Sequence, residues 1–380
     1  MAGTLSGCER RSMPERHLPG RMRAVRTGPD VAVALSSRRR KQWCRKLHRS
    51  DCEPAWFKVR GIGDVLMNMI FVRAALARPL HFASFWLGDA LRRAKAIRCA
   101  RILMYHHIGP DAVSVEQFQA HLELLRNNFE VIPFGQLLNR LASHSLTGAE
   151  IVITFDDGVR NNFHVAWPLL REQNVPATFF VCPGLIDSGE WIWRLELRAR
   201  LALLGVAERR RLAAAVKCAG AKIEDLMTWT KKLPYAARRE FQASVNARTR
   251  QFEPTTAQID EFAPMTWSQL LELDPRLITI GSHTSTHPIL VGLSEELAHA
   301  EIAGSRAALE RRLGRPIELF CFPNGSHDRS AMEIVNRNYR AAVTTRQAVI
   351  RGNDDLHSLP RVPAGDALPL FLRRLHRPSA

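Results

Sequence analysis

The sequence predicts an α/β fold built on parallel strands. Short apolar runs rich in Val, Ile and Phe alternate with helical patterns, and the connections between them are short. Elements joined in this order form a parallel sheet with right-handed crossovers. Several apolar runs end in Asp or His, where parallel α/β folds place their chemistry. A chain of 380 residues can hold one or two domains with additions.

The run from Ile151 to Phe155 is the clearest strand of the predicted sheet. Its Ile and Val residues crowd a helix but fit a pleated surface, and Asp156, Asp157 and Gly158 follow it directly. Other strands are expected at residues 100–105, 129–132, 177–181, 277–283, 318–322, 341–344 and 359–362. Helices are expected at residues 115–127, 134–141, 162–173, 270–273 and 294–313. Pro168 should kink the third of these helices or delay its start.

Residues 190–264 interrupt the alternation of strands and helices. They are rich in Ala, Leu, Arg, Lys and Glu and contain few strand candidates. We interpret them as a helical insertion of three or four helices that caps one face of the domain. The alternation resumes at Met265. The main domain is expected to span residues 100–365 and to be followed by a C-terminal tail over residues 366–380.

The positive charge of the chain is concentrated near its start. The formal net charge is +17, but residues 1–100 hold 21 of the 54 basic and seven of the 37 acidic side chains. No nucleic acid is therefore expected as a partner of the main domain. Residues 1–65 are expected to form a basic, disordered extension. A nucleic-acid-binding arm over residues 1–60 is one alternative. We favour another, that residues 1–66 are not part of the native protein, because Met67 and Met69 precede the first well-patterned segment.

Residues 66–99 are expected to form an amphipathic helical lead-in to the domain. Their apolar stretch is too short to span a bilayer. Peripheral contact of residues 65–97 with an anionic membrane is one interpretation, and packing of this helix on the domain is the favoured one. Because no export signal is evident, a cytoplasmic location and one at the inner membrane both stay open. The sequence predicts no oligomeric state.

The side chains expected to bind a metal are His and Asp. The seven Cys residues are scattered and form no Cys-x-x-Cys pair, which argues against a disulfide framework and a Cys-type zinc site. Parallel barrel strands share one carboxyl rim, so His106, Asp156, Asp157, His283 and His287 should meet there. Two imidazoles and one carboxylate leave open positions on zinc or a similar divalent ion. The other carboxylate can then take a proton from water that the ion activates.

These motifs resemble the polysaccharide deacetylase superfamily, also known as the NodB-homology or carbohydrate esterase 4 superfamily. The resemblance covers about residues 100–365. It is carried by Leu-Met-Tyr-His at 103–106, Thr-Phe-Asp-Asp-Gly at 154–158, Pro-Ala-Thr-Phe-Phe-Val at 176–181, Gly-Ser-His-Thr-Ser-Thr-His at 281–287 and Phe-Pro-Asn-Gly at 322–325. It implies an α/β fold, a distorted (β/α) barrel of the NodB-homology type, with a metal-dependent N-deacetylase site.

The resemblance also implies roles for individual residues. By position, Asp156 resembles the catalytic base of the family. Asp157, His283 and His287 resemble its ligands for a divalent metal ion, for which zinc is expected. The backbone N–H of Asn324 occupies the place of the family's oxyanion donor.

The chain departs from the family pattern in three places. Cys321 and Asn324 replace the Arg and the Tyr of an Arg-Pro-Pro-Tyr motif. No clear Asp-x-x-Asp-Trp motif follows, and the late Leu-x-x-His that supplies the usual acid is missing. The Met-Tyr-His strand is similar to the branch that acts on poly-N-acetylglucosamine and other exopolysaccharides, which implies His106 as the acid. Arg361 is predicted to orient Asp156 in place of the lost Arg.

The sequence therefore predicts a metal-dependent hydrolase that removes N-acetyl groups from a GlcNAc-containing saccharide. Its expected partner is an N-acetylated carbohydrate of unspecified linkage and length. Two alternatives stay open: the same fold acting on another amide or an acetyl ester, and a catalytically weak carbohydrate-binding relative. His327 and His357 are weaker candidates for the acid, and His107 is expected to be structural.

Overall fold

The structure, a computed structural model, describes residues 88–109, 112–365 and 367–377. All of them belong to one compact unit. The predictions made for residues 1–65 lie outside the described residues. Most of the lead-in predicted over residues 66–99 lies outside them too, and so does most of the segment, residues 65–97, proposed to contact a membrane. The described end of that lead-in is helical over residues 88–96. Among the described residues, no helix has both the length and the hydropathy that crossing a bilayer requires.

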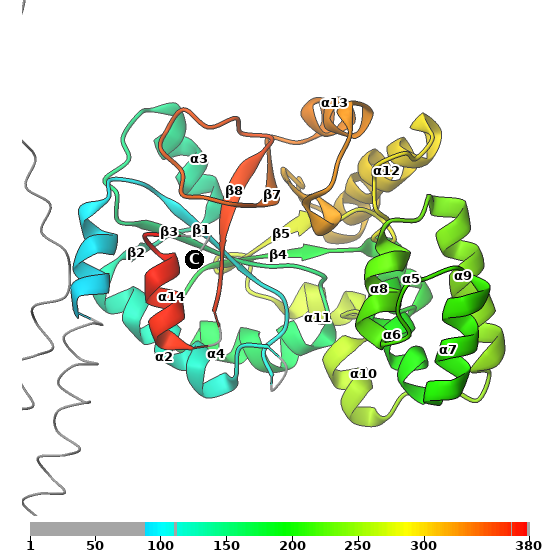
Figure 1. Ribbon diagram of the computed structural model, residues 1–380. Helices are drawn as coiled ribbons and strands as arrows, with labels where there is room; N and C mark the ends of the chain where they lie inside the picture. Colours follow the sequence, from blue (N-terminus) through cyan, green and yellow to red (C-terminus); the bar gives the residue numbers. More distant parts are fainter. Residues whose placement is uncertain (1–87, 110–111, 366, 378–380) are drawn as a thin grey trace, which may run out of the picture. The chain divides into compact units, whose positions relative to one another are not determined.

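Seven parallel strands close into a barrel (Figure 1). They follow the order β1-β8-β7-β6-β5-β4-β3, and β3 pairs with β1 to complete the ring. Their bounds are β1 Arg101–Tyr105, β3 Glu150–Phe155, β4 Ala177–Val181, β5 Ile278–Ser282, β6 Leu319–Cys321, β7 Ala341–Gln347 and β8 Leu359–Pro363. A short strand, β2 (Glu130–Val131), pairs with the start of β3 outside the ring. The predicted distorted (β/α) barrel is confirmed.

Strand β3 carries the two neighbouring acids at its end. All six of its residues are buried, and it pairs with β1 over Ile151–Phe155 and near its end with β4. A strand buried on both faces reads as a continuous apolar run, which is why Ile151–Phe155 was the clearest signal in the sequence. The acids that follow it therefore emerge at the carboxyl rim of the barrel.

Helices cover the outside of the barrel. Their bounds are α2 Val115–Asn128, α3 Phe134–Ala142, α4 Trp167–Glu172, α5 Pro183–Ser188, α11 Trp267–Glu272, α12 Glu295–Leu313 and α13 Arg329–Asn338. The disturbance expected at Pro168 takes the form of a π-helical turn, η1 (Asn162–Ala166), with Pro168 in the first turn of α4. Proline has no N–H to donate, so it is tolerated at a helix start. Helix α12 is capped by Ser294 and ends at Gly314 in a left-handed conformation.

The insertion contains five helices, not the three or four that the sequence suggested. They are α6 Trp193–Leu203, α7 Val206–Ala215, α8 Ile223–Lys231, α9 Tyr235–Arg248 and α10 Thr256–Phe262. The linkers between them are short, so in the sequence the apolar patterns of neighbouring helices could not be told apart. Helices α6 to α9 share a hydrophobic cluster that includes Leu197, Leu226 and Phe241 and is separate from the barrel clusters. In Figure 1 these green helices lie together beside the strands.

The segment expected as a C-terminal tail contains a helix, α14 (Leu368–Arg374), which corrects that prediction. Phe371, Leu372 and Leu375 are buried in the main core cluster, and α14 packs against α2. The ring of Phe371 stacks on His121 with centroids 3.8 Å apart. A seven-residue helix with Pro369 in its first turn gives too short a pattern for periodicity to reveal it.

Candidate active site

The carboxyl ends of the strands surround one pocket of about 810 Å³. Six of the seven residues predicted for the site line it: His106 after β1, Asp156 and Asp157 after β3, His283 and His287 after β5, and Asn324 after β6. The seventh, Arg361, lies behind the pocket in β8 and is buried. The structure thus brings together residues that are separated by up to 255 positions in the chain.

Asp156 is held by Arg361 through two parallel hydrogen bonds. The Nη1 and Nη2 atoms of Arg361 donate to Oδ1 and Oδ2 of Asp156 at 2.6 and 2.7 Å. Arg361 also donates to the Thr344 carbonyl at 2.9 Å, which fixes the guanidinium plane. Burial alone would raise the pKa of Asp156, but the charge and hydrogen bonds of Arg361 lower it to about 2. The carboxylate is therefore ionised at neutral pH and can accept a proton.

Asp157, His283 and His287 form a compact set of three ligand atoms. Oδ1 of Asp157 lies 3.3 Å from Nε2 of His287 and 3.6 Å from Nε2 of His283. In a tetrahedral zinc site with bonds of about 2.0–2.1 Å, neighbouring ligand atoms lie about 3.3–3.4 Å apart. The two distances from Asp157 are close to that value, and all three ligand atoms lie within 4.8 Å of one another, so the set suits a divalent ion such as zinc.

The protonation of Asp157 and His287 also suits a metal. The pKa of Asp157 lies well below its usual range because Arg194 and both histidines outweigh its burial. Burial lowers the pKa of His287 to about 4, so its ring is neutral at physiological pH. Nδ1 of His283 donates to the Cys321 carbonyl at 2.7 Å. That bond directs Nε2 of His283 towards Asp157, as is common for metal-binding histidines. Cys321 and the carboxylates of Asp157 and Asp156 outweigh burial and hold the pKa of His283 well above its usual range, so a metal would displace a proton from this ring.

Strained backbone positions cluster at this site. Asp157, His287 and Asn324 adopt left-handed conformations with φ of 73°, 60° and 56°. A residue with a Cβ pays about 1–3 kcal/mol for such a conformation, so it persists only where the surroundings impose it. Hydrogen bonds hold two of the three: Thr284 accepts from the His287 N–H at 3.0 Å, and Thr345 donates to the Asn324 carbonyl at 3.2 Å. The strained positions are thus those that orient two candidate metal ligands and the main-chain N–H predicted to be the oxyanion donor.

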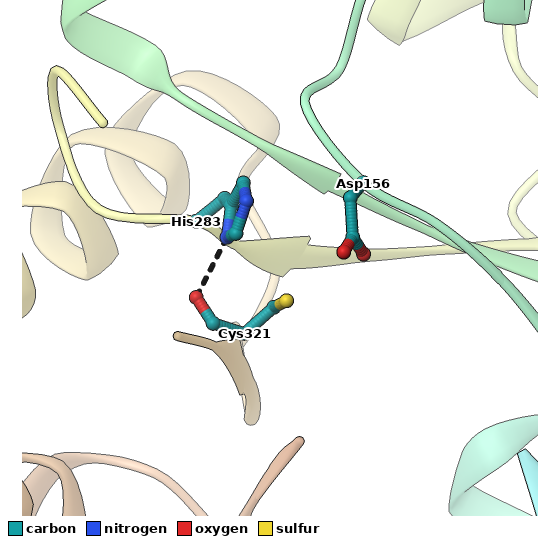
Figure 2. A group of neighbouring side chains, drawn as sticks. All are labelled: Asp156, His283 and Cys321. Carbon is teal, nitrogen blue, oxygen red and sulfur yellow. Dashed lines mark hydrogen bonds between the residues drawn. The ribbon is translucent and has the colours of Figure 1, made fainter. Parts of the chain in front are cut away.

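Cys321 creates a second group of possible metal ligands with Asp156 and His283. Figure 2 shows the three side chains, which come from the ends of β3, β5 and β6, with the Cys321 carbonyl bonded to His283. This group fits a metal less well. Both oxygens of Asp156 are already bonded to Arg361, and burial raises the pKa of the Cys321 thiol, whereas metals bind the thiolate. The set of Asp157, His283 and His287 is the better metal site.

His106 and Asn324 lie on the wall of the same pocket. Burial lowers the pKa of His106 despite the nearby Asp157 and Asp156, so its imidazole is neutral at neutral pH. Its carbonyl accepts a hydrogen bond from Asn162 at 2.6 Å, which anchors the residue after β1. Asn324 stands in a 3-10 turn, and a Cβ at the following Gly325 would collide with Thr345 at 2.1 Å. The turn therefore depends on glycine at that position.

The two weaker candidates for the acid, His327 and His357, do not line the pocket, whereas His107, which was expected to be structural, does. His327 packs on Phe322 with ring centroids 4.4 Å apart, and His357 bonds to the Tyr339 carbonyl at 2.8 Å. His107 reaches the edge of the pocket, where Nε2 lies 3.3 Å from Glu261. Of these three, only His107 lies near the candidate chemistry.

Comparison with known proteins identifies the family. The sequence profile of the family described as "Polysaccharide deacetylase" matches residues 144–252 and 247–342, which together make up just over half of the chain. This chain belongs to the polysaccharide deacetylase family. A curated relative is "Putative polysaccharide deacetylase YxkH" of Bacillus subtilis (strain 168), with 21% identity over 271 residues. That alignment covers 69% of this chain and 70% of the relative.

Solved structures of other deacetylases have the same fold. The Streptococcus pyogenes deacetylase PplD in complex with acetate aligns with a TM-score of 0.51 and 19% identity, over 73% of this chain and 98% of its own. IcaB from Ammonifex degensii aligns with the same score and identity, over 74% and 98%. At this identity the likeness supports the barrel fold of this chain and no more.

Two residues of this deacetylase site were missed by the sequence analysis. Arg194 of α6 donates to Oδ2 of Asp157 at 2.5 Å, and Lys231 at the end of α8 lines the pocket. Both come from the helical insertion, which was expected only as a cap. An arginine and a lysine in helices rich in both carry no local signal, so only the tertiary fold reveals their position.

Proposed function

We propose that this member of the family is a metal-dependent N-deacetylase that acts on a GlcNAc-containing saccharide. The observation that supports the proposal most is the pairing of the two neighbouring acids with different partners. Asp156 is bonded to Arg361, whereas Oδ1 of Asp157 faces two imidazoles. One carboxylate is thereby directed to proton transfer and the other to a metal.

In this proposal Asp157, His283 and His287 hold a divalent ion, and we propose zinc because it favours imidazole and carboxylate ligands in open sites. Such an ion would activate water and polarise the substrate carbonyl. Asp156 accepts the proton of the attacking water. The main-chain N–H of Asn324 donates to the oxygen that becomes negative.

His106 gives the last proton to the leaving amine in this scheme. Since its imidazole is neutral at rest, the proton must first reach it from Asp156 or from solvent. Replacing His106 with Gln should therefore lower kcat by about 10²–10⁴-fold and leave the metal content unchanged. A His106→Gln protein with wild-type acetate release and metal content would refute this role.

A catalytically weak carbohydrate-binding relative fits the site less well. The family's Arg is replaced by Cys321, but the guanidinium of Arg361 lies 3.3 Å from the Cys321 sulfur and reaches Asp156 from β8. The lost interaction is thus replaced from another strand. This replacement supports an active enzyme, because a protein that only binds sugar has no need of an ionised base held in place.

Acetate release from a panel of saccharides tests the proposal. The panel should contain N-acetylated and O-acetylated sugars, free and lipid-linked, with Asp156→Asn as the inactive control. We expect release from N-acetylated GlcNAc saccharides by the zinc-loaded protein and none by the control. Release from O-acetyl sugars or from another amide alone would favour the alternative substrates. Carbohydrate binding without any release would favour the weak relative.

A further inference from the structure

The helical insertion places two cationic side chains on the wall of the candidate active site. Arg194 of α6 and Lys231, the last residue of α8, line the pocket that contains Asp156 and Asp157. The insertion as a whole carries 14 basic and nine acidic residues, whereas the rest of residues 101–380 carries 19 and 21. The positive excess of this part of the chain therefore belongs to the insertion, and part of it faces the pocket.

The acids of the pocket do not balance this charge. Among the described residues that line it, the acidic side chains are Asp156 and Asp157. Arg361 neutralises Asp156, and the proposed metal ion would more than neutralise Asp157. Lys231 forms no ion pair with any described residue, and Glu224 on the same helix is bonded by Arg198 at 2.5 and 3.0 Å. The wall contributed by the insertion is therefore cationic.

The electrostatic surroundings of Lys231 agree with this arrangement. The Lys231 side chain is exposed, but desolvation by its neighbours and repulsion from Arg194 and Arg198 outweigh the attraction of Glu224 and lower the pKa of its ammonium group. An incoming anion would relieve that repulsion. Arg194 can share in such a contact, because a guanidinium has five N–H donors and the bond to Asp157 is made through Nη2.

On the basis of the proposed deacetylase function, we propose that Arg194 and Lys231 form an oxyanion subsite for the substrate. The saccharide would carry a carboxylate or a phosphate close to the N-acetylated sugar. Arginine and lysine side by side recognise both groups. The insertion would thus determine which N-acetylated saccharides this barrel accepts.

Three saccharides of equal length test the subsite: a neutral GlcNAc oligomer, an oligomer alternating GlcNAc and glucuronic acid, and a GlcNAc oligomer phosphorylated at one end. Acetate release by the zinc-loaded, full-length enzyme gives kcat/KM for each. Equilibrium binding of the same saccharides to the Asp156→Asn protein gives a readout that does not require turnover. Lys231 is the residue to vary, because Arg194 also touches a proposed metal ligand.

We expect the wild type to prefer at least one anionic saccharide, and the better of the two to identify the anion as carboxylate or phosphate. Lys231→Glu should weaken binding of that saccharide at least tenfold and change binding of the neutral one less than twofold. Lys231→Met should show the same trend more weakly, which guards against misfolding of the charge-reversed variant. The matched control is Lys232→Glu, since Lys232 is adjacent and exposed but does not line the pocket.

Three results separate this inference from the function on which it rests. Equal binding of neutral and anionic saccharides by the wild type would overturn the subsite, even if acetate is released. An equal loss of binding in Lys232→Glu would also overturn it, because the effect would then be one of general charge. Preferential binding of an anionic saccharide without any acetate release would leave the subsite standing and refute the deacetylase proposal.

Discussion

The barrel and the helical insertion each hold one of the two neighbouring acids, and they do so differently. Two parallel hydrogen bonds join Asp156 to Arg361, a residue of β8 whose side chain is fully buried. Asp157 is bonded to Arg194, a residue of α6 whose side chain is 27% exposed. The first contact lies inside a closed parallel sheet, whereas the second joins the sheet to helices with a core of their own.

This difference suits two different roles in the site. A base must begin every turnover ionised and held in one direction, and a buried arginine in a barrel strand supplies both conditions. A partly exposed arginine on an added helix can contact a ligand as well as an acid. In our proposal the barrel carries the chemistry and the insertion selects the substrate.

Removing Arg361 should produce the largest effect. Arg361→Met leaves Asp156 buried without a cation, which should destabilise the protein by about 3–5 kcal/mol and strongly reduce acetate release. The pKa of Asp156 should also rise, so the acidic limb of the activity profile should move to higher pH. Urea unfolding and the pH dependence of kcat/KM measure the two effects. A variant as stable and as active as the wild type would show that the barrel arginine does not hold the base.

The separate core of the insertion should unfold without the barrel when it is weakened. Leu226 of α8 is fully buried in that core, so Leu226→Ala should cost about 2–5 kcal/mol locally. Hydrogen exchange should then lose protection in α8 and α9 and keep it in β3 and β4. An equal loss of protection in β3 would show that the two regions unfold as one unit.

Replacing Arg194 should cost far less stability than replacing Arg361. Because its side chain is partly exposed, Arg194→Met should change the free energy of unfolding by about 1 kcal/mol or less. The same urea titration measures both variants side by side. A loss as large as that of Arg361→Met would erase the distinction between the two arginines.

Acid should weaken the barrel through Glu150 at the start of β3. Glu150 is buried, and main-chain N–H groups, Arg140 and Thr147 bond its carboxylate, which lowers its pKa to about 2 despite burial. A group with a lowered folded pKa stabilises the protein above its unfolded value of about 4.3. This contribution is lost as the pH falls from there through about 2. Urea midpoints at pH 5 and pH 3 should therefore differ less in Glu150→Gln than in the wild type.

The sequence was most informative where a short segment decides the structure. The buried strand before Asp156, the spacing of His283 and His287, and the glycine after Leu313 are local patterns, and the structure has the corresponding elements in place. Arg361 was predicted to contact Asp156 because Cys321 stands where the family has an Arg. The bonds to Asp156 are present in the structure, in keeping with the need of a buried carboxylate for a cation, and the role of Arg361 stays a prediction.

Other features depend on contacts that no local pattern records. Arg194 and Lys231 are two of 14 basic residues in the insertion, and only the packing of α6 and α8 distinguishes them. Helix α14 is too short for periodicity, and burial of Phe371 stabilises it. The number of insertion helices was underestimated because short linkers join similar apolar patterns. Tertiary contacts decide all three features.

A zinc titration of two single-atom variants tests the division of roles between the neighbouring acids most directly. Asp156→Asn and Asp157→Asn each replace one carboxylate with an amide of nearly the same shape. Calorimetric titration of the metal-free proteins should show near wild-type zinc affinity in Asp156→Asn, with no acetate release after loading. Asp157→Asn should lose both zinc affinity and acetate release. Wild-type zinc binding by Asp157→Asn, or its loss in Asp156→Asn alone, would contradict the assignment of Asp157 to the metal and Asp156 to the proton.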